Sequence, residues 1–183
     1  MYGIINKSIE EMVTMHCGEQ TWKKIVADSG IAIDFFISDQ SYDDATTYKL
    51  ANSISKELNT PVDEILFSFG EYWILQTGIK KYDFLLKAGG ATMKEFIINL
   101  PEFHNRIALM YPKLQPPEFR VTDVQDDNLL LHYYSDRPGL QVFVKGLLSG
   151  IAKMYYQDAE VLVKQSKDEN SDHDIFHIKF LNA

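Results

Sequence analysis

Cysteine is almost absent from this chain, and the shortage limits the kinds of protein it can be. Cys17 is the one cysteine among 183 residues, so no internal disulfide can form. A chain without disulfides suits a reducing compartment. We expect Cys17 to serve as a small apolar residue at a helix end rather than as a redox thiol.

Long apolar runs and excess positive charge are also missing. Polar residues interrupt the N-terminal stretch MYGIINKSIEEM, so it does not resemble a signal peptide. No window approaches the ~20 apolar residues that a membrane helix needs. Lys and Arg number 18 against 26 Asp and Glu, and the net charge of −8 argues against a general nucleic-acid binder. We expect a cytoplasmic protein that binds neither membrane nor nucleic acid.

The common signatures of catalysis are absent too. The sequence contains no GxSxG, Walker loop, HExxH or CxxC. The paired glycines of KAGGAT lack the strand–glycine–helix context of a phosphate loop, so they predict a turn. Repeats and low-complexity linkers are missing, while the hydrophobic fraction of 45% can build a full core. These features predict a single domain over residues 1–183 with no enzyme activity.

The first two thirds of the chain carry helical periodicity. Apolar residues recur every three or four positions, and the stretches are bounded by capping residues, glycine or proline. Thr92 and Glu95 have the spacing of a capping box, and the last stretch must end near Pro112. Helices are predicted over residues 3–18, 19–30, 43–58, 59–79, 91–100 and 100–112.

The last third alternates in the manner of strands. Four strands are predicted over residues 118–124, 128–135, 159–165 and 173–181, with a very apolar helix over 138–156. In the last strand Phe176, Ile178 and Phe180 are expected to face the core. The fold class is therefore α+β: a helical N-terminal part packed on a four-stranded antiparallel sheet with one inserted long helix.

Three polar side chains alternate near the end of the second predicted strand. Tyr133, Ser135 and Arg137 would share one face of an extended segment, and all three donate hydrogen bonds. A guanidinium forms paired, charge-assisted bonds with carboxylate or phosphate, so the trio suits an anion. The alternative is the ordinary polar face of a half-exposed strand.

The five histidines offer one candidate metal ligand. His173 and His177 are four residues apart in a predicted strand, which separates them by ~13 Å and excludes a shared metal. His104 instead lies among apolar helical residues, a plausible setting for a haem axial ligand. The alternative is a hydrogen-bonded core histidine.

Together these residues resemble the haem-nitric oxide/oxygen binding (H-NOX) domain, found in soluble guanylate cyclase and in bacterial stand-alone proteins. Its Tyr-x-Ser-x-Arg signature is similar to Tyr133-Tyr134-Ser135-Asp136-Arg137, and the opening MYGIINKSIEEMV and closing DHDIFHIKF also look like family members. The resemblance implies haem b (iron protoporphyrin IX) buried between the helical part and the sheet. Tyr133, Ser135 and Arg137 would hold the propionates, and His104 would be the axial ligand.

The same resemblance implies further pocket residues. Pro117, second of the pair Pro116-Pro117, would press on the porphyrin and distort it, with Ile5 as another haem contact. In O₂-binding members a distal tyrosine three residues before a glycine donates to the gas; that position is Phe143 here, or Val142 if the preceding segment is one residue longer. The remaining distal residues implied are Ile4, Trp73 and Leu147. Tyr2 and Tyr72 are interpreted as core or rim aromatics.

An apolar distal pocket implies a particular gas preference. The resemblance predicts a sensor that binds NO and CO and largely excludes O₂. NO would weaken the iron–His104 bond and so signal in trans to a histidine kinase or cyclic-di-GMP enzyme. Two other functions stay open: a haem-based gas carrier or scavenger without a partner, and a domain that binds a non-haem anion.

Overall fold

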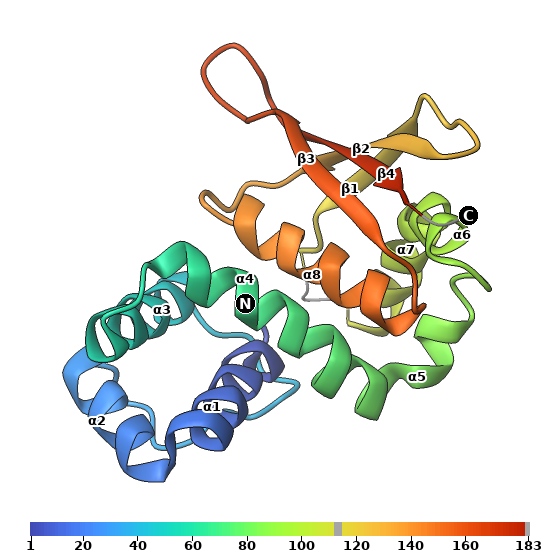
Figure 1. Ribbon diagram of the computed structural model, residues 1–183. Coiled ribbons are helices and arrows are strands. Elements are labelled where there is room, and N and C mark those ends of the chain that lie inside the picture. The colour runs from blue at the N-terminus through green and yellow to red at the C-terminus, as the bar shows by residue number, and fades with distance from the viewer. Residues whose placement is uncertain (112–114, 182–183) are drawn as a thin grey trace. The chain divides into compact units, whose positions relative to one another are not determined.

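The computed structural model describes residues 1–111 and 115–181, and it divides into two compact units, residues 1–69 and residues 70 onward. Figure 1 follows the chain through both. Among the described residues, no helix is both long enough and apolar enough to cross a bilayer. The expectation of one domain over the whole chain stays a prediction, and each unit is described by itself.

The first unit is helical, as the periodicity predicted. Its helix α2 packs against its neighbours on both sides in the chain. The Asp43 carboxylate caps α3 by accepting from the Ala45 amide, and the core includes Val13, Ile25 and Leu50. The elements are α1 (Gly3–Cys17), α2 (Glu19–Ser29), α3 (Asp44–Leu58) and the greater part of α4 (Val62–Tyr72).

The second unit holds the remaining helices and all the strands. The predicted helix over 59–79 is wrong in one respect: α4 ends at Tyr72 and the chain continues as a π-helix. Thr92 caps α6 as predicted, and Pro112 lies outside the described residues. The elements are η1 (Trp73–Gly78), α5 (Ile79–Lys87), α6 (Met93–Ile98), α7 (Leu100–Met110), β1 (Glu118–Thr122), β2 (Asn128–Tyr134), α8 (Gln141–Met154), β3 (Ala159–Gln165) and β4 (Asp174–Phe180).

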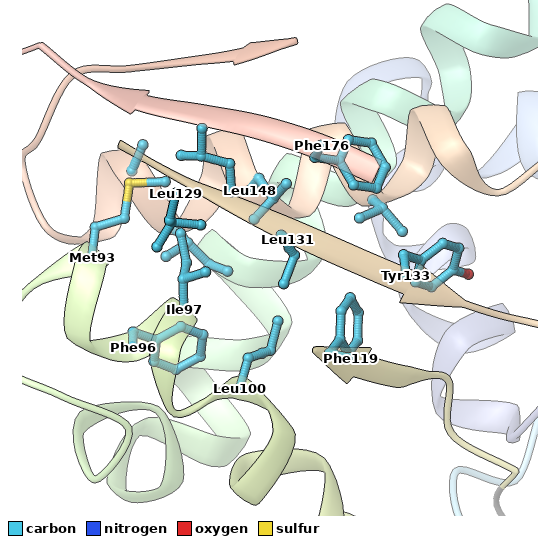
Figure 2. Packing of buried hydrophobic residues seen from close by; sticks show 14 of the residues in the cluster. Met93, Phe96, Ile97, Leu100, Phe119, Leu129, Leu131, Tyr133, Leu148 and Phe176 are labelled. Atoms are coloured by element: carbon cyan, nitrogen blue, oxygen red, sulfur yellow. The ribbon is translucent and has the colours of Figure 1, made fainter. Parts of the chain in front are cut away.

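The four strands form one antiparallel sheet in the order β1-β2-β4-β3, which confirms the α+β prediction. One face of the sheet is apolar because alternate residues share a face. Phe176 and Ile178 are fully buried and Phe180 is 4% exposed, as predicted. Figure 2 shows this face packed against residues of α6, α7 and α8, including Met93, Phe96, Ile97, Leu100 and Leu148.

The end of α4 crosses α8 with backbone against backbone. A Cβ placed at Gly70 would lie 2.5 Å from the carbonyl oxygen of Phe143 and 2.6 Å from the amide nitrogen of Leu147. Real Cβ atoms do not approach other atoms so closely. The close approach of α4 to α8 therefore requires glycine at position 70.

We expect Gly70→Ala to destabilise the protein. The added methyl group must push the α8 backbone away, and overpacking of this kind costs about 1–3 kcal/mol. Urea unfolding would measure the lowered free energy of unfolding. Ser68→Ala, at an exposed position of the same helix, is the control and should leave that free energy unchanged or slightly raised. Equal stability of the two variants would contradict the close crossing.

Candidate functional site

The histidine singled out by the sequence, His104, lies on the second turn of α7. Its Nδ1 lies 3.0 Å from the backbone carbonyl oxygen of Leu100, one helical turn earlier. A carbonyl only accepts hydrogen bonds, so Nδ1 carries the proton and donates it. The neutral ring then presents an unprotonated Nε2, the form that binds a metal.

The surroundings of His104 keep the imidazole uncharged. Its ring contacts two aromatic rings, with centroid separations of 4.7 Å to Phe119 and 5.5 Å to Phe103. Burial lowers the pKa of His104 to about 4, and the hydrogen bond to Leu100 opposes this only in part. At neutral pH the ring is therefore a neutral nitrogen donor. The apolar helix expected around it is only partly buried, because Leu109 and Met110 are 82% and 52% exposed.

The polar trio lies at the end of β2, in a different arrangement from the predicted extended segment. The strand ends at Tyr134, and Ser135 and Arg137 lie in the turn that follows. The Arg137 backbone amide donates to the Ser135 hydroxyl at 3.1 Å. Burial raises the pKa of Tyr133, and a side-chain hydrogen bond with Ser135 opposes this only in part. The chain therefore turns at Ser135, and the Arg137 side chain leaves this turn toward the segment before β1.

Strand β1 brings the trio and the histidine together. Phe119 pairs with Tyr133 in the sheet, and their ring centroids are 5.4 Å apart. The same Phe119 ring contacts His104, so one phenyl group links the two. Figure 2 shows Phe119 beside Tyr133. Phe119 was not among the residues predicted from the sequence. Its place two residues after Pro117 was the available signal.

The proline predicted to touch the porphyrin is held near the trio. Pro117 is half-buried and immediately precedes β1. The Arg137 guanidinium donates to the backbone carbonyl of Gln115 at 2.8 Å, so this side chain ties the segment before β1 to the turn after β2. The role of Pro117 in bending a porphyrin stays a prediction.

Three of the expected distal residues belong to the second unit. Phe143 and Leu147 are half-buried one turn apart on α8, and their backbone faces Gly70. Trp73 opens the π-helix, and its ring stacks on Tyr82 at 6.3 Å. The Trp73 Nε1–H is buried and has no hydrogen-bond partner within residues 1–111 and 115–181. A buried donor without a partner is costly unless something else accepts its hydrogen bond.

The other predicted residues lie in α1, near it or in α4. Ile4 and Ile5 are half-buried in the first turn of α1, in the first unit, so their part in the pocket stays a prediction. Tyr2 and Tyr72 are buried, as expected of core aromatics. Cys17 ends α1 and is half-buried.

A histidine pair that the sequence analysis missed lies on the sheet face opposite the core. Nδ1 of His132 is 2.9 Å from Nε2 of His173, and Asp172 accepts from Nδ1 of His173 at 2.6 Å. The spacing of His173 and His177 along one strand gave no sign of this pair, because the partner of His173 is His132 on the neighbouring strand β2. Across the described part of the chain, no group of three or more His, Cys, Asp or Glu side chains could hold a metal ion.

The chemistry of these residues fits haem. A neutral imidazole with a free Nε2 suits an iron ligand, and hydroxyls with a guanidinium suit propionate carboxylates. Apolar side chains on α8 and the unpartnered indole N–H suit the wall of a pocket whose occupant is partly polar. In this assignment His104 would hold the iron, and Tyr133, Ser135 and Arg137 the propionates.

Comparison with known proteins agrees with this donor set. The sequence model of the family described as Haem-NO-binding matches residues 2–163. Soluble guanylate cyclase gcy-35 of Caenorhabditis elegans is 33% identical over 191 residues, covering 99% of this chain and 27% of the relative. The beta-2 subunit of soluble guanylate cyclase from Rattus norvegicus is 40% identical over 95 residues, covering 52% and 14%. The chain thus spans about a quarter or less of the length of these relatives.

Solved structures share the fold. An H-NOX protein from S. oneidensis in the Fe(II)NO ligation state superposes with a TM-score of 0.89 at 20% identity, covering all of both chains. Fe(II) unliganded H-NOX protein from K. algicida gives 0.88 at 22% identity, covering 100% of this chain and 98% of that one. With the family match over residues 2–163, these findings establish that the chain belongs to the Haem-NO-binding family, the H-NOX domains, a family of haem-binding gas sensors.

Proposed function

We propose that this chain is a nitric oxide sensor that holds haem b through His104, binds CO as well and discriminates against O₂. The observation that carries the proposal is the hydrogen bond from His104 Nδ1 to the Leu100 carbonyl, which leaves a neutral Nε2 for iron. Held by His104, ferrous haem would supply the iron that takes up the gas, and His104 would be the ligand whose hold on the iron weakens when NO binds. The proposal gives the chain no catalytic step of its own.

The part of the chain that would report gas binding is α7. His104 is fixed to its own helix by the Leu100 carbonyl, so a displacement of the ring acts on the helix backbone. The same helix ends with Leu109 and Met110 exposed to solvent. A shift of α7 between two positions would change that surface, which is how a partner in trans could read the signal. The proposed partner is a histidine kinase or a cyclic-di-GMP enzyme.

A carrier or scavenger would use the same residues without a partner. Affinity for the gas suffices for a carrier, whereas a sensor needs a partner that distinguishes two states. Measuring the autophosphorylation of a candidate kinase with the unliganded and the NO-treated protein separates the two. Identical kinase activity in both mixtures, and with every candidate partner, would favour the carrier.

Discrimination against O₂ depends on Phe143, whose phenyl group has no hydrogen-bond donor. Bound O₂ is polar and gains from a donor, whereas CO is a poor acceptor. We expect Phe143→Tyr to raise O₂ affinity by about 1 kcal/mol, the usual size of one hydrogen bond, and to leave CO affinity nearly unchanged. Absorption titrations of the ferrous protein with both gases measure this. Phe143→Leu, which also lacks a donor, is the control.

The unpartnered Trp73 N–H favours a second candidate function, reversible O₂ binding. An indole N–H can donate to bound O₂ as a tyrosine hydroxyl does. If wild-type protein takes up O₂ reversibly from air and Trp73→Phe abolishes this, the nitric oxide proposal must yield. If the ferrous protein instead remains without O₂ or oxidises, and Trp73→Phe changes nothing, the result supports a distal pocket without a donor and hence the nitric oxide proposal.

A further inference from the structure

The loop between β3 and β4 reaches the polar trio. The Lys167 ammonium donates to the backbone carbonyl of Ser135 at 2.7 Å. This lysine comes from a segment 32 residues later in the chain, and it lies outside the Tyr-x-Ser-x-Arg motif. A second positive charge therefore lies directly against the middle residue of the trio.

A buried carboxylate holds the backbone from which this lysine extends. Asp174 is 8% exposed, and its Oδ1 accepts from the Lys167 backbone amide at 2.8 Å and from Gln141 Nε2 at 2.6 Å. Asp174 also pairs with Tyr133 across the sheet. Asp174 on β4 thus bonds to both the Lys167 backbone and Gln141 at the start of α8. These bonds fix the backbone of Lys167 within the second unit, beside the trio.

The proposed site would hold more negative than positive charge if Arg137 were its one cation. Haem b carries a pair of propionates, and each is an anion at neutral pH. The trio contributes one cation, Arg137, because Ser135 is neutral and burial raises the pKa of the Tyr133 hydroxyl, which keeps it protonated. The negative charge of Asp174 lies nearby as well. One guanidinium leaves the site short of positive charge.

We infer that Lys167 is a second cationic ligand of the haem propionates, acting beside Arg137. This inference rests on the proposed haem site. An ammonium has three donors, so Lys167 can keep its bond to the Ser135 carbonyl and still donate to a carboxylate. Its flexible stem lets it follow the anion as a point charge, while the planar guanidinium of Arg137 fixes orientation.

The test is the rate at which haem passes from the protein to excess apomyoglobin. Lys167→Met should speed the transfer about two- to fivefold, the effect of losing one solvent-exposed ion pair. Lys167→Arg should stay close to the wild-type rate. The matched control is Lys164→Met, which removes the same charge from an exposed position on β3, three residues earlier, and should not change the rate.

A second probe separates binding of propionate from a structural role of the loop. Iron protoporphyrin IX dimethyl ester has no carboxylates, so wild type and Lys167→Met should lose it at the same rate. A faster loss of the ester from Lys167→Met, or equal loss of haem from Lys167→Met and Lys164→Met, would overturn the inference. If wild-type protein took up no haem at all, the proposed function itself would fail, a result distinct from either of these.

Discussion

Replacing His104 with glycine is expected to abolish the normal absorption spectrum of the haem-loaded ferrous protein, and imidazole added to the solution should restore it. His104 has a neutral ring, donates its Nδ1–H to a backbone carbonyl and packs against Phe119, which in turn contacts Tyr133 of the trio. Glycine leaves a space of the shape of the lost ring, so free imidazole can enter and supply the same nitrogen. The measurement is a titration of the variant with imidazole, followed by absorption.

Two controls isolate the role of the ring. Glycine inside a helix costs up to about 1 kcal/mol whatever it replaces. Asn105→Gly, at the neighbouring exposed position of α7, carries this backbone cost and should keep the wild-type spectrum. Wild-type protein should not respond to the imidazole concentrations that rescue the variant. A His104→Gly spectrum identical to that of the wild type would assign the ligand to another residue.

Removing the Arg137 side chain is expected to speed haem loss by about 10- to 150-fold, which corresponds to the roughly 1.5–3 kcal/mol of a charged hydrogen bond. Transfer to apomyoglobin measures this rate. The effect should exceed that of Lys167→Met, because a guanidinium forms paired bonds with a carboxylate and also holds the Gln115 carbonyl. Arg137→Lys keeps the charge but loses the paired geometry, and an intermediate rate is expected.

The control for Arg137→Ala is Arg120→Ala. Arg120 is an exposed arginine on β1, engaged with Glu118 and with the ring of Tyr134 on the other sheet face. Its loss removes one positive charge from the same sheet but none from the trio. Equal haem loss from the two alanine variants would mean that general charge, and not a specific contact, retains the haem. Melting curves of the haem-free variants show whether either change disturbs the fold.

Much of the fold could be predicted from local pattern. Period-two alternation identified the buried face of β4, and the capping pair at Thr92 and Glu95 marked the start of α6, because both signals arise within a few residues. The switch from α- to π-helix at Trp73 could not be predicted this way. Helical periodicity continues through that segment, and its contacts with α5 and α8 are not visible in local sequence.

In the candidate site, too, local sequence indicates some residues, and contacts between distant parts of the chain place the others. His104 and the trio could be proposed from the sequence because a motif and an apolar helix lie in short stretches of sequence. The places of Phe119 and Lys167 beside these residues could not be predicted, because they come from strand pairing and from a contact 32 residues distant along the chain. The tautomer of the His104 ring also could not be predicted from the sequence, because it depends on which group forms a hydrogen bond with Nδ1.

The backbone contact between Gly70 and α8 has a consequence for how such a pocket can diversify. At this crossing the position of α8 is set by main-chain atoms of Phe143 and Leu147, so their side chains are not what separates the two helices. Substitutions at these two positions can then accumulate without moving the helix that bears them. We expect the gas preference of the proposed pocket to be open to evolutionary change by single mutations, while any side chain added at Gly70 lowers the stability of the protein.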